Sequence, residues 1–147
     1  MSGRFSGSAD VDRPIAEVYA FLAEGTNDPK FSPRVLSITK EPEGPSAVGT
    51  IFVSKVKDAG MKTDRRFELT ELVEPTTIRW SERSKNLITA DGGYDLEDLG
   101  GGRTKVTIFN TLEGHGFGKV LQGFAVKAAQ RDADAFAQRI KVAVEAS

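Results

Sequence analysis

The feature that most constrains this chain is its C-terminal segment, residues 117–146, which contains no proline. Apolar residues recur there at three- and four-residue steps, which predicts one long helix. The apolar residues of its first half are Phe117, Val120, Leu121, Phe124 and Ala128. Those of its second half, which lie well around the helix from the first set, are Ala129, Ala133, Phe136, Ala137, Ile140 and Val144. A helix packed on a flat sheet buries one continuous stripe of side chains. Here the apolar face changes direction between the two halves of the helix, which predicts a curved sheet that grips it.

Composition narrows the classes of function. The chain has 147 residues, which fits a single domain over residues 1–147 with one substantial core. A net charge of −1 with 28% charged residues provides no basic field, so we expect no nucleic-acid partner. The absence of cysteine removes disulfides, thiol nucleophiles and thiolate metal ligands, and the single histidine removes most imidazole chemistry. We therefore expect neither a metal nor a cofactor.

The sequence also bears on location and assembly. The N-terminus lacks an apolar signal core, and no stretch approaches the length of a membrane span. We expect a cytoplasmic protein without stable membrane insertion. Whether it is a monomer or a homodimer stays open.

The segments before the long helix begin with a weakly alternating, serine-rich predicted strand, residues 4–11. A helix follows, because Asp12 is a good N-cap, Pro14 suits the first turn and an apolar stripe continues after it. The next segment, residues 27–33, has two prolines and turn-forming residues around Phe31. It predicts a tight turn that tucks the Phe31 ring inward.

Further strands are predicted at residues 35–40, 50–57, 63–73, 77–84, 88–99 and 103–112. The last four form two hairpins, with turns at residues 74–76 and 100–102. Strands and helices are segregated along the chain, so the predicted class is α+β. The architecture is a curved antiparallel sheet of about six to seven strands wrapped around the long C-terminal helix.

Side-chain alternation gives a register for the first hairpin. If Val73 pairs with Ile78, the period of two places one set of side chains on the inward face. This set is Phe67, Leu69, Glu71, Val73, Ile78, Trp80 and Glu82. The opposite, solvated face carries Arg66, Arg79 and Arg83. Glu68 then lies opposite Arg83 as a cross-strand charge pair.

The second hairpin is organised in the same way. Pairing Leu96 with Val106 puts Tyr94 on the apolar face and brings Gly92 beside Asn110. Glycine inside a strand commonly marks a bulge or a bend. Such a bend is what a sheet that wraps a helix needs.

Five short motifs occur in order along the chain: residues 12–22 (DRPIAEVYAFL), 31–33 (FSP), 44–50 (GPSAVGT), 72–80 (LVEPTTIRW) and 102–106 (GRTKV). In these motifs and their spacing the sequence resembles the START-related superfamily, often called SRPBCC, and within it the polyketide cyclase/dehydrase-like branch. The resemblance spans almost the whole chain and implies the helix-grip fold. It also implies a container for apolar or aromatic small molecules, since members bind lipids, steroids or hormones and some cyclise polyketides.

Glu71 and Glu82 are the candidates for acid–base catalysis. The register places both among apolar side chains, where a carboxylate acquires a raised pKa and could exchange a proton with a carbonyl ligand. The alternative is that the sheet end is open there and both glutamates reach water.

The other inward side chains are predicted to line a cavity. Tyr94 and Asn110 could orient a ligand oxygen by hydrogen bonds, or could be core residues whose polar tips are satisfied internally. The full predicted ligand-binding set is Phe31, Phe67, Leu69, Trp80, Tyr94, Asn110, Phe117, Leu121 and Phe124. His115 precedes the long helix in a glycine-rich turn and is interpreted as a loop residue, because no orienting partner is evident.

Three functions follow as hypotheses. The first is binding or transport of an apolar or aromatic small molecule, lipid- or polyketide-like, between the sheet and the C-terminal helix. The second is a polyketide cyclase or dehydratase that uses a pocket carboxylate as acid and base. The third is a protein-interaction module, which predicts an exposed apolar patch and little cavity.

Overall fold

The computed structural model describes residues 2–58 and 60–147, and Met1 and Ala59 lie outside the described residues. The chain begins with β1 (Ser2–Val11), α1 (Ile15–Ala23) and a 3-10 helix, η1 (Gly25–Lys30). Then come β2 (Val35–Glu41), β3 (Ile51–Asp58), β4 (Met61–Val73), β5 (Thr77–Glu82), β6 (Ile88–Gly100) and β7 (Arg103–Gly114). The last element is the long helix α2 (Gly118–Glu145).

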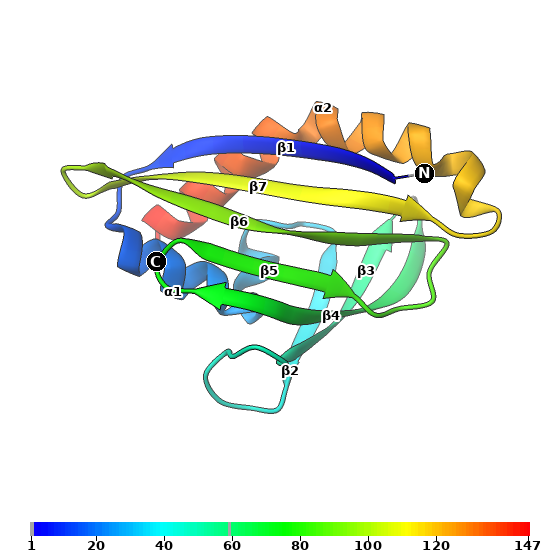
Figure 1. Ribbon diagram of the computed structural model, residues 1–147, viewed down its shortest axis with the longest axis horizontal. Helices are drawn as coiled ribbons and strands as arrows, with labels where there is room; N and C mark the ends of the chain where they lie inside the picture. Colours follow the sequence, from blue (N-terminus) through cyan, green and yellow to red (C-terminus); the bar gives the residue numbers. More distant parts are fainter. Residues whose placement is uncertain (1, 59) are drawn as a thin grey trace.

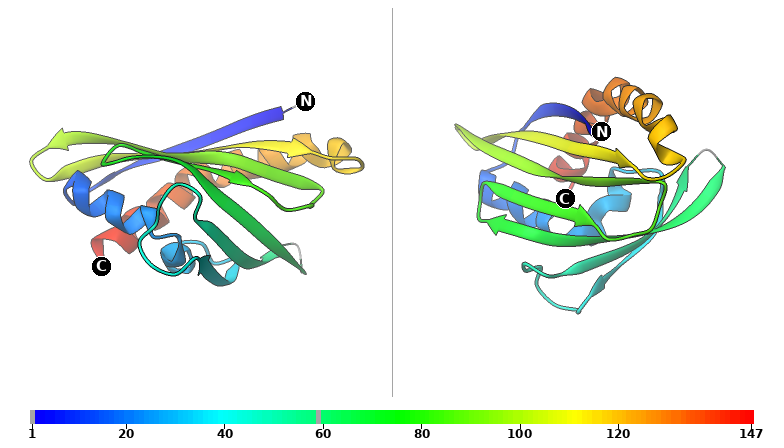
Figure 2. Two further views of the ribbon diagram at one scale, coloured as in Figure 1. Left: turned by 60° about the horizontal axis from the view of Figure 1, so that its bottom comes forward. Right: turned by 45° about the vertical axis from the view of Figure 1, so that its right-hand side comes forward.

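The strands form one seven-stranded antiparallel sheet in the order β1-β7-β6-β5-β4-β3-β2. Consecutive strands from β2 to β7 are neighbours, and β1 pairs with β7 from Ser2 opposite Glu113 to Val11 opposite Thr104. The sheet curves, and the helices lie on its concave side (Figures 1 and 2). The predicted α+β class and helix-grip fold are confirmed.

The start of α1 differs from the prediction. Pro14, not Asp12, is the N-cap residue, and it makes no side-chain capping bond. The Asp12 amide instead donates to Glu145 Oε2 at 2.8 Å, and its carboxylate pairs with Arg103 Nε at 3.3 Å. Asp12 therefore ties the start of α1 to the end of α2 and to β7, which the local sequence does not reveal.

The packed core lies where α1 and the second half of α2 meet the sheet. Its most deeply buried side chains, each at most 1% exposed, include Val11, Val18, Ile78, Val106, Ile140 and Val144. Burying such an aliphatic side chain stabilises the fold by roughly 1.5–3 kcal/mol. Gly7 of β1 allows the close approach of α2, because a Cβ there would lie 2.4 Å from the carbonyl oxygen of Ala133.

The two halves of α2 differ in how they agree with the prediction. In the second half, Ala133, Ala137, Ile140 and Val144 are buried as predicted. In the first half the predicted apolar stripe is wrong: Phe117, Val120 and Phe124 are 67%, 68% and 76% exposed. The buried residues there are Gly118 and Gln122, which let the helix approach the end of β7.

Contacts at the start of α2 explain this reversal. A Cβ on Gly118 would lie 2.0 Å from the Leu87 carbonyl oxygen, and Gln122 Oε1 accepts a hydrogen bond from the Gly114 amide at 2.9 Å. The face with small and hydrogen-bonding residues is thus the one that fits against the sheet. The bulky apolar face is turned to solvent.

The predicted register of β4 and β5 is wrong by one residue at the turn and by two residues before the bulge, where Glu68 lies opposite Ser81 instead of Arg83. Leu72, not Val73, pairs with Ile78, and a bulge interrupts the pairing between Leu69 and Glu71. The bulge turns Glu71 and Val73 to the outer face, and Val73 is 49% exposed. The predicted Glu68–Arg83 charge pair is present, with 3.1 Å between Arg83 Nε and Glu68 Oε1.

The predicted register of β6 and β7 is confirmed. Leu96 pairs with Val106, and Gly92 pairs with Asn110. A Cβ on Gly92 would lie 2.3 Å from Asn110 Oδ1, so the glycine makes room for the Asn110 side chain. The three turn glycines, Gly100–Gly102, all have positive φ, as a tight turn there requires.

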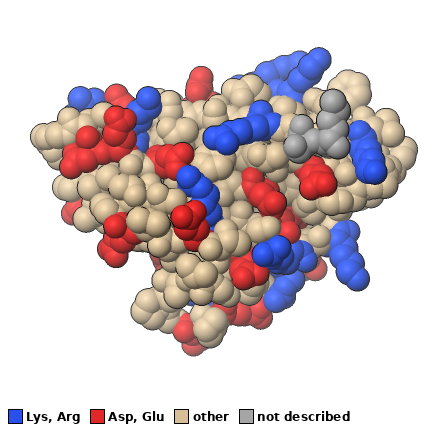
Figure 3. Space-filling view, viewed as in Figure 1, with Lys and Arg blue, Asp and Glu red and all other residues tan. Residues whose placement is uncertain are grey.

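Acidic and basic side chains are interspersed on the face shown in Figure 3. No helix within the described part of the chain has both the length and the apolar character needed to cross a membrane. The absence of a nucleic-acid partner stays a prediction.

Candidate functional site

A cavity of about 590 Å³ lies between the sheet and α2. Its wall is built from inward side chains of all seven strands, from the end of α1, from η1 and the segment after it, and from α2. The volume falls within the range of roughly 300–1,000 Å³ that is typical of small-molecule sites. Apolar groups dominate the wall, and a few polar side chains are set among them.

Most of the predicted ligand-binding residues lie in this wall. They are Phe31, Phe67, Leu69, Trp80, Tyr94 and Asn110. Phe31 is held by edge-on packing against Phe136 of α2, with 5.7 Å between the ring centroids. Their contact with a ligand stays a prediction.

The three predicted residues of the first half of α2 do not line the cavity. Phe117, Leu121 and Phe124 lie on the surface, where 38% to 76% of each is exposed. Small residues of α2, Ala125, Ala128 and Ala129, form that part of the wall. Because alanines leave space that larger side chains would fill, the helix contributes volume to the cavity here.

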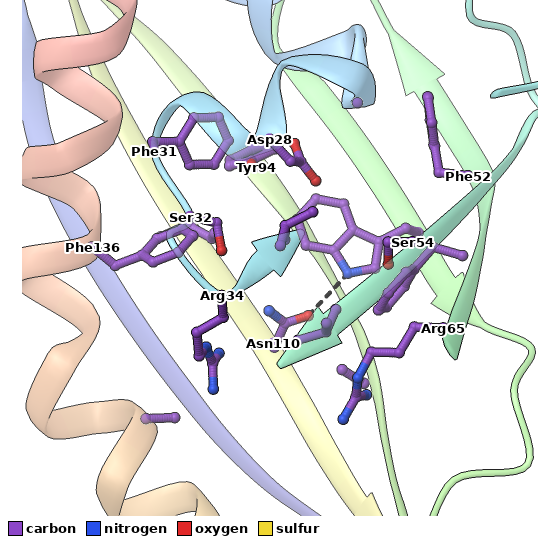
Figure 4. Close-up of a pocket in the computed structure, with 18 of the residues that line it drawn as sticks. Asp28, Phe31, Ser32, Arg34, Phe52, Ser54, Arg65, Tyr94, Asn110 and Phe136 are labelled. Atoms are coloured by element: carbon purple, nitrogen blue, oxygen red, sulfur yellow. Dashed lines mark hydrogen bonds between the residues drawn. The ribbon is translucent and has the colours of Figure 1, made fainter. Parts of the chain in front are cut away.

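A hydrogen bond links two side chains of the cavity wall. Trp80 Nε1 donates to Asn110 Oδ1 at 3.0 Å, a bond drawn in Figure 4. The Tyr94 ring packs edge-on against the indole, with 5.0 Å between centroids. Trp80 and Asn110 therefore fix each other, and both lie on the predicted inward face.

The two predicted catalytic glutamates take different positions. Glu71 is exposed on the outer face, because the β4 bulge reverses its direction, so its predicted place in the cavity is wrong. Glu82 points inward as predicted, and its side chain is 0% exposed. Yet it lies behind the cavity wall, where the Ala90 amide, Ser84 and Asn86 all donate hydrogen bonds to its carboxylate.

Glu82 holds an arginine that does reach the cavity. Arg65 Nη1 lies 2.9 Å and 3.1 Å from the two Glu82 carboxylate oxygens, and Arg65 is part of the cavity wall. A carboxylate so fully hydrogen-bonded serves to orient the guanidinium. Glu82 is therefore arranged to position Arg65, and of these two charged residues only Arg65 lines the cavity.

The other arginines of β4 and β5, and Arg83 directly after β5, point outward, as the alternation predicted. Arg79 pairs with Asp95 at 2.6 Å, Arg66 pairs with Glu41 at 3.2 Å, and Arg83 pairs with Glu68. Arg65 has the same alternation parity as the predicted inward residues of β4. Extending the register by one step would have found it.

Three further polar residues of the wall come from η1 and the segment after it, namely Asp28, Ser32 and Arg34. Figure 4 shows Asp28 next to Tyr94, whereas Arg34 and Arg65 lie toward the opposite end with Asn110 between them. Burial raises the pKa of Asp28 to about 7, from an ordinary value of 3.8. Burial and the charge of Asp28 also raise the pKa of Tyr94 well above its usual value.

Sequence reasoning gave no sign of Asp28. It sits in a turn, where no alternation exists, and Asp before Pro is a common turn dipeptide. Only the folding of η1 over the sheet carries its carboxyl group to the cavity.

His115 lies apart from the cavity. It is exposed and shares a 2.8 Å hydrogen bond between its Nε2 and Thr89 Oγ1. Within residues 2–58 and 60–147, no cluster of three or more His, Cys, Asp or Glu could hold a metal ion.

A protein-family model described as "Polyketide cyclase / dehydrase and lipid transport" matches residues 2–145. Comparison with curated protein sequences gives no significant match.

Several solved structures share the fold. TTHA0849 from Thermus thermophilus superposes with a TM-score of 0.79 at 17% identity, over 98% of both chains. The Zhui aromatase/cyclase from Streptomyces sp. R1128 gives 0.73 at 14% identity, over 99% of this chain and 93% of that one. A START superfamily protein from Mycobacterium smegmatis gives 0.71 at 12% identity, over 95% and 97%. At these identities the likeness establishes the fold alone.

Proposed function

We propose, from the premise that the chain belongs to the polyketide cyclase/dehydrase and lipid transport family of the START-related (SRPBCC) superfamily, that its cavity binds an apolar or aromatic small molecule. The observation that carries the proposal is the cavity of about 590 Å³ with its largely apolar wall. Transfer of apolar ligand surface from water into such a space supplies affinity, at roughly 25 cal/mol per Å².

Polar groups of the wall would orient the ligand. Arg65 carries a positive charge, and Glu82 holds it in place through one nitrogen, Nη1. Asn110 presents its amide, which is fixed by the bond from Trp80. A ligand with an anionic or carbonyl oxygen fits this end of the cavity best, since both residues can donate hydrogen bonds.

A cyclase or dehydratase is the second candidate, and one observation favours it. Asp28 has a pKa of about 7, close to the value that suits a general acid or base at neutral pH. In this hypothesis Asp28 takes the role first assigned to Glu71 and Glu82. A protein-interaction module meets one of its two predictions, the exposed apolar face at the start of α2, but it also predicts little cavity and is therefore the least favoured.

The binding proposal can be tested through Trp80, which is the only tryptophan of the chain and part of the cavity wall. Titration with fatty acids, steroids and naphthoic acids should quench or shift its fluorescence. No spectral change with any of them would contradict the proposal.

A pair of variants shows where the ligand binds. Ala129→Phe should fill part of the cavity and weaken binding at least tenfold, because Ala129 belongs to the wall. Ala135→Phe, on the exposed side of the same helix, is the matched control and should leave binding unchanged. Equal affinities in the two variants would place the ligand outside the cavity.

A further inference from the structure

We propose that the Asp28 carboxyl group and the Tyr94 hydroxyl form a second polar subsite of the cavity, which binds a hydroxyl group on an aromatic ligand. The anionic group of the same ligand would then lie at the opposite end, near Arg65. The inference rests on the proposed function, because it needs the cavity to be a ligand site. It specifies the ligand class as aromatic acids that carry a phenolic hydroxyl.

Geometry brings the two side chains together from distant parts of the sequence. Asp28 comes from η1 and Tyr94 from β6, and they lie next to each other in the cavity (Figure 4). The Asp28 carbonyl oxygen accepts hydrogen bonds from the Phe31 amide at 3.1 Å and the Ser32 amide at 2.8 Å, so the turn that carries its side chain is fixed.

Tyr94 is held equally firmly. It is 5% exposed, its ring packs on Trp80, and its carbonyl oxygen accepts a bond from Arg79 Nη1 at 3.1 Å. A ligand would therefore meet a preformed pair of groups, with little ordering cost on binding.

The polar ends of the pair lie in the wall of the cavity. Among residues 2–58 and 60–147, no hydrogen bond is made by the Tyr94 hydroxyl or by the Asp28 carboxyl group. Tyr94 is buried and Asp28 is half-buried, and since both line the cavity a molecule bound there can supply the hydrogen-bond partner of each group.

The hydrogen-bonding capacity of Asp28 and Tyr94 favours a hydroxyl group of the ligand as their partner. Near neutral pH Asp28 is divided between its acid and carboxylate forms, because its pKa is about 7. The Tyr94 hydroxyl both donates and accepts, and a ligand hydroxyl can do the same toward either form of Asp28. A ligand carboxylate at this place would be repelled by ionised Asp28, so the anionic group belongs at the Arg65 end.

The test compares two ligands that differ by one hydroxyl group, 2-naphthoic acid and 6-hydroxy-2-naphthoic acid. Binding to the full chain is measured by calorimetry at pH 6.5, where the phenol is neutral. The wild-type protein should bind the hydroxylated acid about tenfold more tightly, which corresponds to about 1.4 kcal/mol.

Two variants identify the subsite. Tyr94→Phe and Asp28→Leu should each reduce this tenfold preference to about twofold or less. The preference is the ratio of the two affinities in each variant, so an equal weakening of both acids leaves it unchanged. If Asp28→Leu does not fold, Tyr94→Phe decides alone, because it removes one oxygen atom and keeps the ring packing.

The outcomes separate this inference from the proposed function. If the wild type binds both acids equally, or if Tyr94→Phe keeps the preference, the subsite is refuted while ligand binding in the cavity stands. If the wild type binds neither acid, both the subsite and binding of aromatic acids in the cavity are refuted.

Discussion

Replacing Asp28 by asparagine should stabilise the protein, and the gain should grow with pH. The substitution keeps the shape of the side chain and removes its ability to ionise. In the folded state burial raises the pKa of Asp28 to about 7, whereas an unfolded chain has the ordinary value of 3.8. Between these values the unfolded state loses the proton first, so ionisation favours unfolding.

The magnitude follows from the two pKa values. Each pKa unit corresponds to about 1.4 kcal/mol. Ionisation of Asp28 therefore lowers the free energy of unfolding of the wild type by at most about 4 kcal/mol. This decrease is absent below about pH 4, grows between pH 4 and pH 7, and is complete by pH 8. From pH 5 to pH 8 the advantage of Asp28→Asn over the wild type should therefore increase by up to about 3 kcal/mol.

Urea denaturation at pH 5, 6, 7 and 8 measures this difference. Asp132→Asn is the matched control, because Asp132 also lines the cavity but is exposed and pairs with Arg139 at 2.8 Å. Its stability relative to the wild type should not rise with pH in this way. An advantage of Asp28→Asn that grows by less than about 0.5 kcal/mol from pH 5 to pH 8 would show that the carboxyl group is not desolvated.

Three further predictions concern stability and are measured by urea denaturation. Glu82→Gln should lower the free energy of unfolding by about 3 kcal/mol, because Arg65 loses the carboxylate that pairs with it and the Glu82 side chain is 0% exposed. A decrease below about 0.5 kcal/mol, as is usual for a surface substitution, would argue against the importance of this ion pair. Phe31→Ala should cost about 3–5 kcal/mol and Phe124→Ala less than about 0.5, since they are 4% and 76% exposed; similar losses would contradict the observed orientation of α2. Gly7→Ala should cost about 1–3 kcal/mol, because its Cβ would meet the α2 backbone at 2.4 Å, and a neutral effect would mean that this contact is looser.

The fold was predictable where side-chain patterns are continuous. In β6 and β7 the alternation runs unbroken, so Leu96 could be paired with Val106 correctly. In β4 it is interrupted by the bulge after Leu69. A bulge adds one residue without any required residue type, so the pattern on its far side was assigned to the wrong face and Glu71 with it.

The first half of α2 shows a second limit. Hydrophobic periodicity indicates that a helix has an apolar face, but it does not tell which face meets the sheet. Here close packing of the helix backbone determines which face is buried, since Gly118 and Gln122 fit against the end of β7 and the neighbouring loop. Phe124 was therefore predicted inside and lies outside.

The candidate site was partly predictable for the same reasons. Six of the nine predicted ligand-binding residues line the cavity, because each belongs to a regular strand or to a turn with a clear aromatic anchor. Arg65 follows the same alternation in β4, so its inward position could also have been predicted. Asp28 did not, because no periodic rule governs a 3-10 turn.

The sequence by itself determined the order of the elements, the α+β class, the helix-grip fold and the family, since these follow from local patterns of apolar residues, turns and motifs. Only the tertiary structure decided how the polar groups act. The pKa of Asp28, the pairing of Glu82 with Arg65 and the place of Tyr94 in the cavity wall depend on what surrounds each group after folding. Desolvation and hydrogen bonding are properties of that environment, and residues far apart in the chain create it.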